Sequence, residues 1–145
     1  MKETKIATII EGGTHTDDRG SLTYFNDFDL SSVKRVYILE HPDISTIRAW
    51  QGHQHENKWF HVVFGSFKLV LVQPDNWNSP SSNLSHEEFV LSARDNQILH
   101  VRSGYATGFK AIEPDSKMLV FSNFSVEESR NDDFRFDKDM WYNWY

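Results

Sequence analysis

The chain has 145 residues, 39% of them hydrophobic, which is the usual size of one domain with its own core. Its formal net charge of −6 disfavours nonspecific contact with a nucleic-acid backbone, so we expect no nucleic-acid partner. The absence of cysteine excludes disulfides and thiolate chemistry, and no apolar run approaches the ~20 residues of a membrane span. Because the first residues also lack the apolar core of a secretory signal, we expect a cytoplasmic protein without a membrane partner.

Short runs of β-branched and aromatic residues recur along the chain between glycine- and proline-containing corners. This pattern predicts an all-β domain of the sandwich or barrel type. The expected strands are residues 5–10, 21–25, 33–39, 47–54, 58–63, 66–73, 86–91, 97–101, 107–111 and 117–122. No repeat or linker divides the chain, so we expect one domain over residues 1–145.

The end of the chain, residues 125–145, is first charged and then aromatic. Its last six residues, MWYNWY, are too apolar to be left in water. We expect this tail to dock on the barrel or on a neighbouring subunit.

The densest group of chemically active side chains lies between residues 47 and 61. Residues two apart on a strand share a face, so Gln51, His53 and His55 are expected to point one way, and Lys58 and Phe60 form a second set. A His-x-His pair suits acid–base work near neutral pH or metal binding, and the third alternative is a pair of surface histidines. A metal needs further ligands, which are hard to find here.

Several short motifs, in their order and spacing, resemble the cupin superfamily, in particular its metal-free branch that acts on sugar nucleotides. They are Asp18-Arg19-Gly20-Ser21-Leu22, Lys34-Arg35-Val36-Tyr37, Ile47-Arg48, the His53 region, Gly65, Ser103-Gly104-Tyr105-Ala106-Thr107-Gly108-Phe109 and Asp132-Asp133-Phe134-Arg135-Phe136. That branch includes the 3,5-epimerases and the WxcM-like 3,4-ketoisomerases of 4-keto-6-deoxyhexoses linked to deoxythymidine diphosphate (dTDP). The resemblance implies a small double-stranded β-helix (jelly-roll) barrel, a nucleotide-diphosphate sugar substrate, no cofactor, a homodimer and a role in deoxysugar and polysaccharide biosynthesis.

Two departures from the metal-binding cupins argue against a metal. Those proteins carry a glutamate seven residues before the glycine that matches Gly65, and here that position is Lys58. Their second motif has a histidine ligand where this chain has Thr107. A cation opposed by Lys58 is poorly held, so we expect no metal; a metal-dependent cupin such as a dioxygenase is the alternative that metal analysis would exclude.

The catalytic pattern differs from that of the 3,5-epimerases. Their base histidine matches Gln51, and their proton-donating tyrosine falls near Val120. The ketoisomerases have histidines three and five residues after the arginine that matches Arg48, and the second of them falls on His53; aligning the His-x-His pair as a unit uses His53 and His55 instead. The resemblance therefore implies a 3,4-ketoisomerase, with a 3- or 3,5-epimerase or a non-catalytic nucleotide-sugar-binding cupin as alternatives.

Both reactions begin with removal of the proton at C3 of the 4-keto sugar, which leaves an enediolate. His53 is the expected base, with His55 or His100 assisting and Tyr37 as acid or hydrogen-bond partner. Lys58 and Arg48 are expected to stabilise the oxyanion. The expected substrate-binding residues are Arg19, Arg35, Arg48, Gln51, Trp50 and Tyr105, and in the family the match of Arg19 reaches the diphosphate across a dimer interface.

Overall fold

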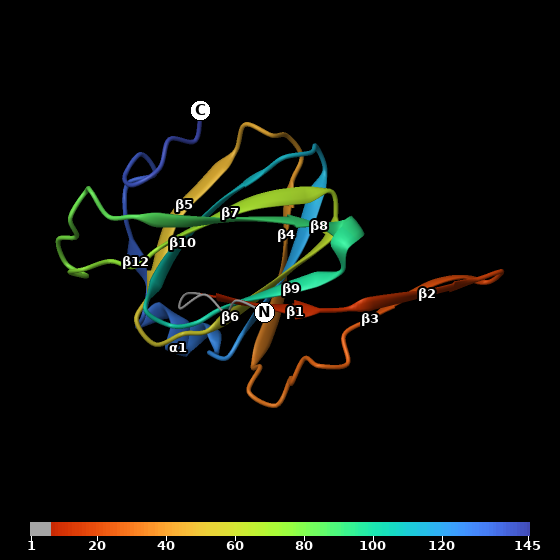
Figure 1. Ribbon diagram of the computed structural model, residues 1–145. Coiled ribbons are helices and arrows are strands. Elements are labelled where there is room, and N and C mark those ends of the chain that lie inside the picture. Colours follow the sequence, from red (N-terminus) through yellow and green to blue (C-terminus); the bar gives the residue numbers. More distant parts are fainter. Residues whose placement is uncertain (1–6) are drawn as a thin grey trace.

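The computed structural model describes residues 7–145, which form a barrel of two five-stranded antiparallel sheets (Figure 1). The first sheet has the order β1 (Ala7–Glu11), β9 (Gln97–Val101), β6 (Lys58–Phe64), β11 (Ser116–Ser122) and β4 (Arg35–His41). The second has the order β12 (Phe134–Arg135), β5 (Ile47–His53), β10 (Tyr105–Ala111), β7 (Ser66–Val72) and β8 (His86–Ser92). The hairpin of β2 (Gly13–Asp17) and β3 (Gly20–Tyr24) projects away from the barrel.

The core lies between the inner faces of the two sheets. Leu69 and Leu71 of β7 meet Met118 and Val120 of β11, and all four side chains are fully buried. Burying such a side chain contributes about 1.5–3 kcal/mol. Because a one-residue slip would turn these side chains to the outside, the core fixes the register of the strands that carry the polar residues described below.

A second apolar cluster lies outside the second sheet, where the aromatic tail covers it. Trp141 and Trp144 are 8% and 6% exposed and pack with Trp50 of β5 and with Val70 and Val72 of β7. The indole Nε1 of Trp50 donates a hydrogen bond to the carbonyl of a tail residue, Met140, at 2.9 Å. In the structure the tail thus packs on the barrel of its own chain.

All ten expected strands are present, and their ends lie within two residues of the predicted ones; the start of the first falls outside the described residues. The pattern does not predict β2, β12, the short helix α1 (Val126–Arg130) or the 3-10 turn η1 (Ala93–Asp95). β2 reads GTHTD and is mostly exposed, so it lacks the apolar alternation that marks a strand. No helix among residues 7–145 is long and apolar enough to cross a membrane.

Candidate functional site

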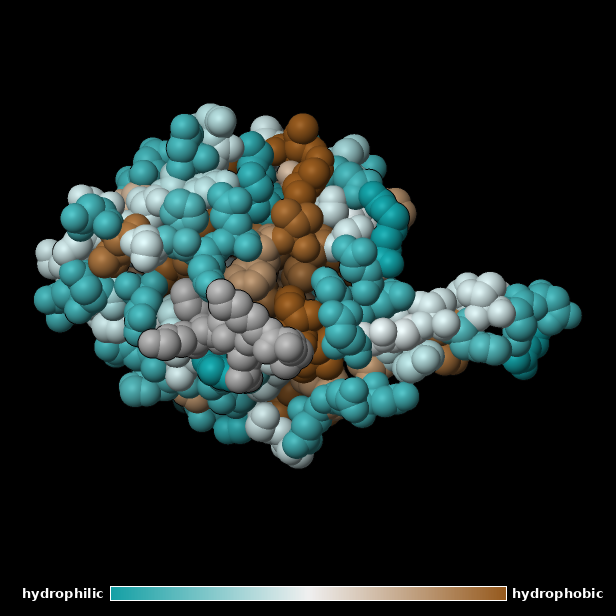
Figure 2. All heavy atoms as spheres, viewed as in Figure 1, coloured by the Kyte–Doolittle hydropathy of each residue, from teal (hydrophilic) through white to brown (hydrophobic). Residues whose placement is uncertain are grey.

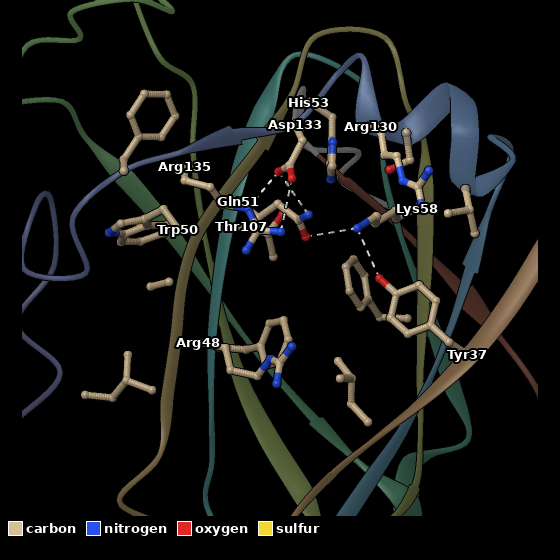
Figure 3. A pocket seen from close by; sticks show the side chains of 18 of the residues that line it. Tyr37, Arg48, Trp50, Gln51, His53, Lys58, Thr107, Arg130, Asp133 and Arg135 are labelled. Atoms are coloured by element: carbon tan, nitrogen blue, oxygen red, sulfur yellow. Dashed lines mark hydrogen bonds and ion pairs between the residues drawn. The ribbon is translucent and has the colours of Figure 1, made fainter.

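A cavity of about 720 Å³ opens between the inner faces of the sheets (Figure 3). It is lined by β4, β5, β6 and β10, and its rim is completed by α1, β12 and their flanking residues. Its basic lining residues are Arg35, Arg48, Lys58, Arg130 and Arg135, against the single carboxylate of Asp133 among the described lining residues. A cavity with this charge balance attracts anions, although the chain as a whole is acidic.

A β-bulge brings Arg48 into the cavity. Arg48 and Gln51 are three residues apart on β5, and strict alternation would place them on opposite faces. The register with β10 shifts here, because Gln51 pairs with Thr107 while Arg48 pairs with Phe109. Two residues of β5 therefore oppose Gly108 alone, and both Arg48 and Gln51 line the cavity.

His53 lies at the end of β5 with its ring buried against the C-terminal segment. Its Nδ1 is 2.7 Å from the main-chain oxygen of Asp132, an acceptor, so Nδ1 carries the proton and donates it. The other ring nitrogen, Nε2, is buried and has no partner among the described residues. Burial and the ammonium of Lys58 lower the pKa of His53, so its ring is neutral at pH 7. A neutral ring with a free Nε2 is able to accept a proton.

A chain of hydrogen bonds crosses the cavity beside His53 (Figure 3). Lys58 Nζ donates to the hydroxyl of Tyr37 at 3.1 Å and to Oε1 of Gln51 at 3.2 Å. Gln51 Nε2 donates to Asp133 Oδ1 at 3.2 Å, and Arg135 Nε donates to the same oxygen at 2.7 Å. Lys58 is buried, and its third ammonium hydrogen has no acceptor among the described residues, which leaves it for an oxygen of a ligand.

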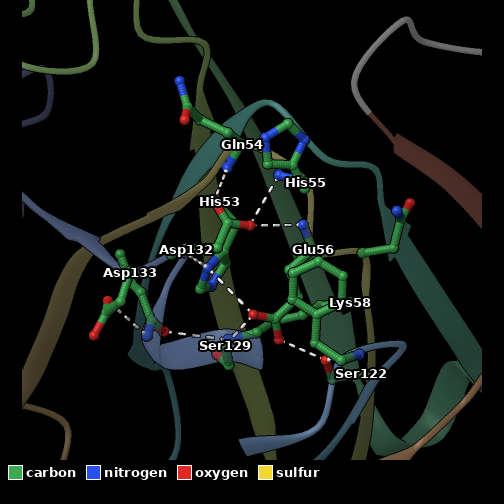
Figure 4. A network of polar contacts seen from close by, with 12 residues as sticks. His53, Gln54, His55, Glu56, Lys58, Ser122, Ser129, Asp132 and Asp133 are labelled. Atoms are coloured by element: carbon green, nitrogen blue, oxygen red, sulfur yellow. Dashed lines mark hydrogen bonds and ion pairs between the residues drawn. The ribbon is translucent and has the colours of Figure 1, made fainter. Parts of the chain in front are cut away.

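The buried carboxylate of Asp132 closes the turn after β5 (Figure 4). It accepts the backbone N–H groups of Gln54, His55 and Glu56 at 2.7, 2.9 and 2.8 Å. Asp132 therefore fixes the loop with its side chain and the ring of His53 with its main chain. The same residue joins the C-terminal segment to the barrel.

The structure brings most of the expected site residues together. Those that line the cavity are Arg35, Tyr37, Arg48, Trp50, Gln51, His53 and Lys58. The indole of Trp50 nevertheless packs against Trp141 and Trp144 of the tail, with ring centroids 5.3 and 5.7 Å apart.

Four expected site residues lie outside the cavity lining. His55 is exposed in the turn that Asp132 closes. His100 pairs in register with Trp59 and stacks on its indole at 4.6 Å, and burial lowers its pKa. Arg19 sits at the tip of the projecting hairpin, bound to Asp17 at 2.6 Å, and Tyr105 is buried in the core at the start of β10.

Several residues of the site were not assigned a role from the sequence. They are Glu56, Ser129, Arg130, Asp132, Asp133 and Arg135. Three of them fall in the motif Asp132 to Phe136, which the family resemblance already singles out, so that motif was the available signal. Glu56 reads as an ordinary charged loop residue until the fold buries it.

Comparison with protein-family models and with curated protein sequences found no match. Solved structures do match. A 3,4-ketoisomerase from Helicobacter canadensis shares 19% identity over 90% of each chain, with a TM-score of 0.70. QdtA, a sugar 3,4-ketoisomerase from Thermoanaerobacterium thermosaccharolyticum in complex with TDP, shares 19% identity over 92% of this chain and 90% of its own, with a TM-score of 0.72. The rmlC epimerase of Mycobacterium tuberculosis shares 18% identity over 94% of this chain and 71% of its own, with a TM-score of 0.73.

The chain has the cupin-type β-barrel fold. In this barrel, the side chains beside His53 in the cavity are the ammonium of Lys58 and the amide of Gln51, a pair that does not suit a cation. Within residues 7–145 no three histidine, aspartate or glutamate side chains converge as a metal site would require.

Proposed function

We propose that this cupin is an isomerase of a nucleotide-linked, dTDP-type 4-keto-6-deoxyhexose and that it carries out 3,4-ketoisomerisation. The observation that carries the proposal is the buried, unpartnered Nε2 of His53 in a cation-lined cavity, with the Lys58–Tyr37 pair in the same cavity. Such a site removes a proton and stabilises the negative charge that remains.

The cavity offers two guanidinium groups for the diphosphate. Arg48 and Arg130 line it, and no hydrogen bond or ion pair of their guanidinium groups is found among residues 7–145. Arg35 and Arg135, in contrast, already hold the carboxylates of Glu56 and Asp133. Guanidinium groups bind phosphate oxygens in pairs, so Arg48 and Arg130 are the proposed diphosphate anchors. The TDP complex of QdtA, which shares the fold, supports this class of ligand.

The proposed reaction starts with transfer of the C3 proton to His53 Nε2. The C–H electron pair then forms the C3–C4 double bond of the enediolate, and negative charge develops on O4 beside Lys58. O4 takes a proton from Tyr37, and the C3 hydroxyl returns one to Tyr37 as the new ketone forms at C3. C4 takes the proton from the His53 imidazolium, so the atoms and charges balance and the protein is restored.

A second candidate is a 3- or 3,5-epimerase of the same substrate class. Val120, which stands near the tyrosine position of the epimerases, pairs in register with Tyr37 on the neighbouring strand. Val120 is in the core and Tyr37 lines the cavity, so a phenol lies next to the position where an epimerase places its acid. The same phenol would then return the proton to C3 on the other face.

Proton NMR of the reaction with dTDP-4-keto-6-deoxyglucose tests the assignment. A product with its ketone at C3 and an unchanged configuration at C5 supports ketoisomerisation. A product that keeps its ketone at C4 but is inverted at C3, with or without inversion at C5, would show that the reaction is epimerisation and not ketoisomerisation. Binding of the sugar nucleotide without any new product would reduce the protein to a nucleotide-sugar-binding cupin.

We further propose that the protein works as a cytoplasmic homodimer in deoxysugar and polysaccharide biosynthesis. The projecting hairpin supports a second subunit, because β2 and β3 extend away from the barrel (Figure 1), Leu22 on β3 is 62% exposed, and Arg19 lies in the turn between the two strands. The outer face of the edge strand β4 is also apolar, with Val36 and Ile38 54% and 65% exposed. Figure 2 shows that strongly hydrophobic residues also gather in a band on the face of the molecule that it draws. Sedimentation velocity should give the mass of two chains, and a single chain at micromolar concentration would exclude the dimer.

A further inference from the structure

A carboxylate lies against the imidazole of His53, on the side of Nδ1 (Figure 4). Glu56 Oε1 is 3.4 Å from His53 Nδ1, and the side chain of Glu56 is completely shielded from solvent. Glu56 is not among the described residues that line the cavity. It therefore contacts the base without being in a position to touch the substrate.

Donors surround the carboxylate of Glu56 on its other sides. Arg35 Nη2 and Ser122 Oγ donate to Oε2 at 3.1 and 2.5 Å, and Ser129 Oγ donates to Oε1 at 2.7 Å. The guanidinium is a donor only, and the ionised carboxylate is the form that accepts from all these groups at once. The same contacts tie together β4, β11 and α1 behind His53.

We propose that Glu56 is the positioning residue of the base: it holds the His53 ring with Nδ1 protonated and stabilises the imidazolium formed when Nε2 takes a proton. This inference rests on the proposed function, because the proton that gives His53 its positive charge is the one removed from C3 of the keto sugar. A carboxylate at 3.4 Å attracts the imidazolium more strongly than the neutral ring, so it lowers the energy of the charged state reached by proton transfer. The proton therefore stays on His53 until it is transferred to C4 of the sugar.

The charged groups that face His53 come from three parts of the fold. Burial, the largest influence, and Lys58 on β6 lower the pKa of His53, whereas Glu56 and Asp132 raise it. Asp133, next to Asp132 in the chain, also interacts with the ring. Removal of the Glu56 charge takes away one of the influences that raise the pKa of His53, so that pKa must fall further.

The test is an NMR titration of the His53 ring nitrogens in the resting protein. Glu56→Gln keeps the size of the side chain and should lower the pKa of His53 by about one unit. With the keto sugar as substrate, the kcat of the Glu56→Gln variant should fall by about tenfold or more. Its KM should stay at the wild-type value, because Glu56 does not line the cavity. Glu40→Gln, which removes an exposed carboxylate paired with Lys117, is the matched control and should change neither quantity.

Breaking a buried ion pair can unfold a protein, so a second variant keeps the test decisive. Glu56→Gln combined with Arg35→Gln removes both charges, and the pKa of His53 should again fall, since the carboxylate is the partner in contact with the ring. An unchanged pKa of His53 in either folded variant overturns the inference. If the pKa falls but wild-type protein exchanges no C3 hydrogen, the proposed function is rejected and the pairing of Glu56 with His53 stands.

Discussion

Lys58 is a buried ammonium whose two hydrogen-bond partners, Tyr37 and Gln51, are both uncharged. Such a charge is costly to bury unless it serves an anionic ligand. We assign it to the O4 oxyanion of the enediolate. Its sequence position, seven residues before Gly65, already separates this chain from the metal-binding cupins, and the structure adds the geometry that makes the ammonium available to a ligand.

Replacing Lys58 by Met tests this assignment, because Met fills a similar volume without charge. We expect kcat to fall by about a hundredfold, the usual effect of removing one oxyanion-stabilising group. The pKa of His53 should rise at the same time, since the Lys58 cation lowers it in the wild type. Steady-state kinetics and NMR titration measure the two effects, and a variant with wild-type kcat would remove Lys58 from the mechanism.

Some residues of the site can be predicted from the sequence, and others cannot. His53 and Lys58 are found from motif spacing, because those positions are fixed relative to Arg48 and Gly65. Glu56 and Ser129 have no such spacing, since their contact joins residues 73 positions apart. Only the packing of α1 against the barrel brings them together.

At the level of elements, the strands follow from alternation, and the parts that alternation misses have specific physical causes. The bulge at Gly108 depends on pairing between β5 and β10, which a single strand does not reveal. Helix α1 is only five residues long, so its sequence is too short to show a repeating pattern of apolar residues. A capping box between Ser125 and Glu128 stabilises its start. The aromatic tail, by contrast, is recognisable as a docking segment from its composition.

The tail supports the site from behind through Trp144, which packs on Trp50 of β5. Trp144→Ala should lower the free energy of unfolding by about 3 kcal/mol, because it leaves a cavity over the second sheet. Urea unfolding followed by circular dichroism measures this change. Tyr145→Ala is the control, since Tyr145 is 82% exposed and should cost little. Equal stability of the two variants would mean that the tail does not hold the sheet.

For the molecule as a whole, buried histidines make stability depend on pH. His41 is 2% exposed, packs on Phe67 and Phe109, and neither ring nitrogen has a partner among the described residues. Burial and the nearby Arg48 lower its pKa in the folded state. The unfolded chain therefore binds a proton more readily, and stability is lost as the pH falls below about 6.5, the pKa of an unperturbed histidine.

His41→Phe should reduce this acid sensitivity. The difference in unfolding free energy between pH 7.5 and pH 5 should shrink by up to about 1.4 kcal/mol for each unit of pKa shift that is removed. Urea unfolding at the two pH values gives the difference directly. An identical pH dependence in His41→Phe and the wild type would show that His41 titrates normally in the folded state.

The proposed mechanism requires His53 to remove the C3 proton of the sugar, and hydrogen exchange at C3 reports this step directly. Proton NMR of dTDP-4-keto-6-deoxyglucose in deuterated water follows loss of the C3 signal with wild-type protein and with His53→Asn. We predict rapid loss with the wild type, and a rate lower by at least about a hundredfold with His53→Asn, the usual contribution of a general base, while binding of TDP is retained. Equal exchange rates in the two folded proteins would show that His53 is not the base.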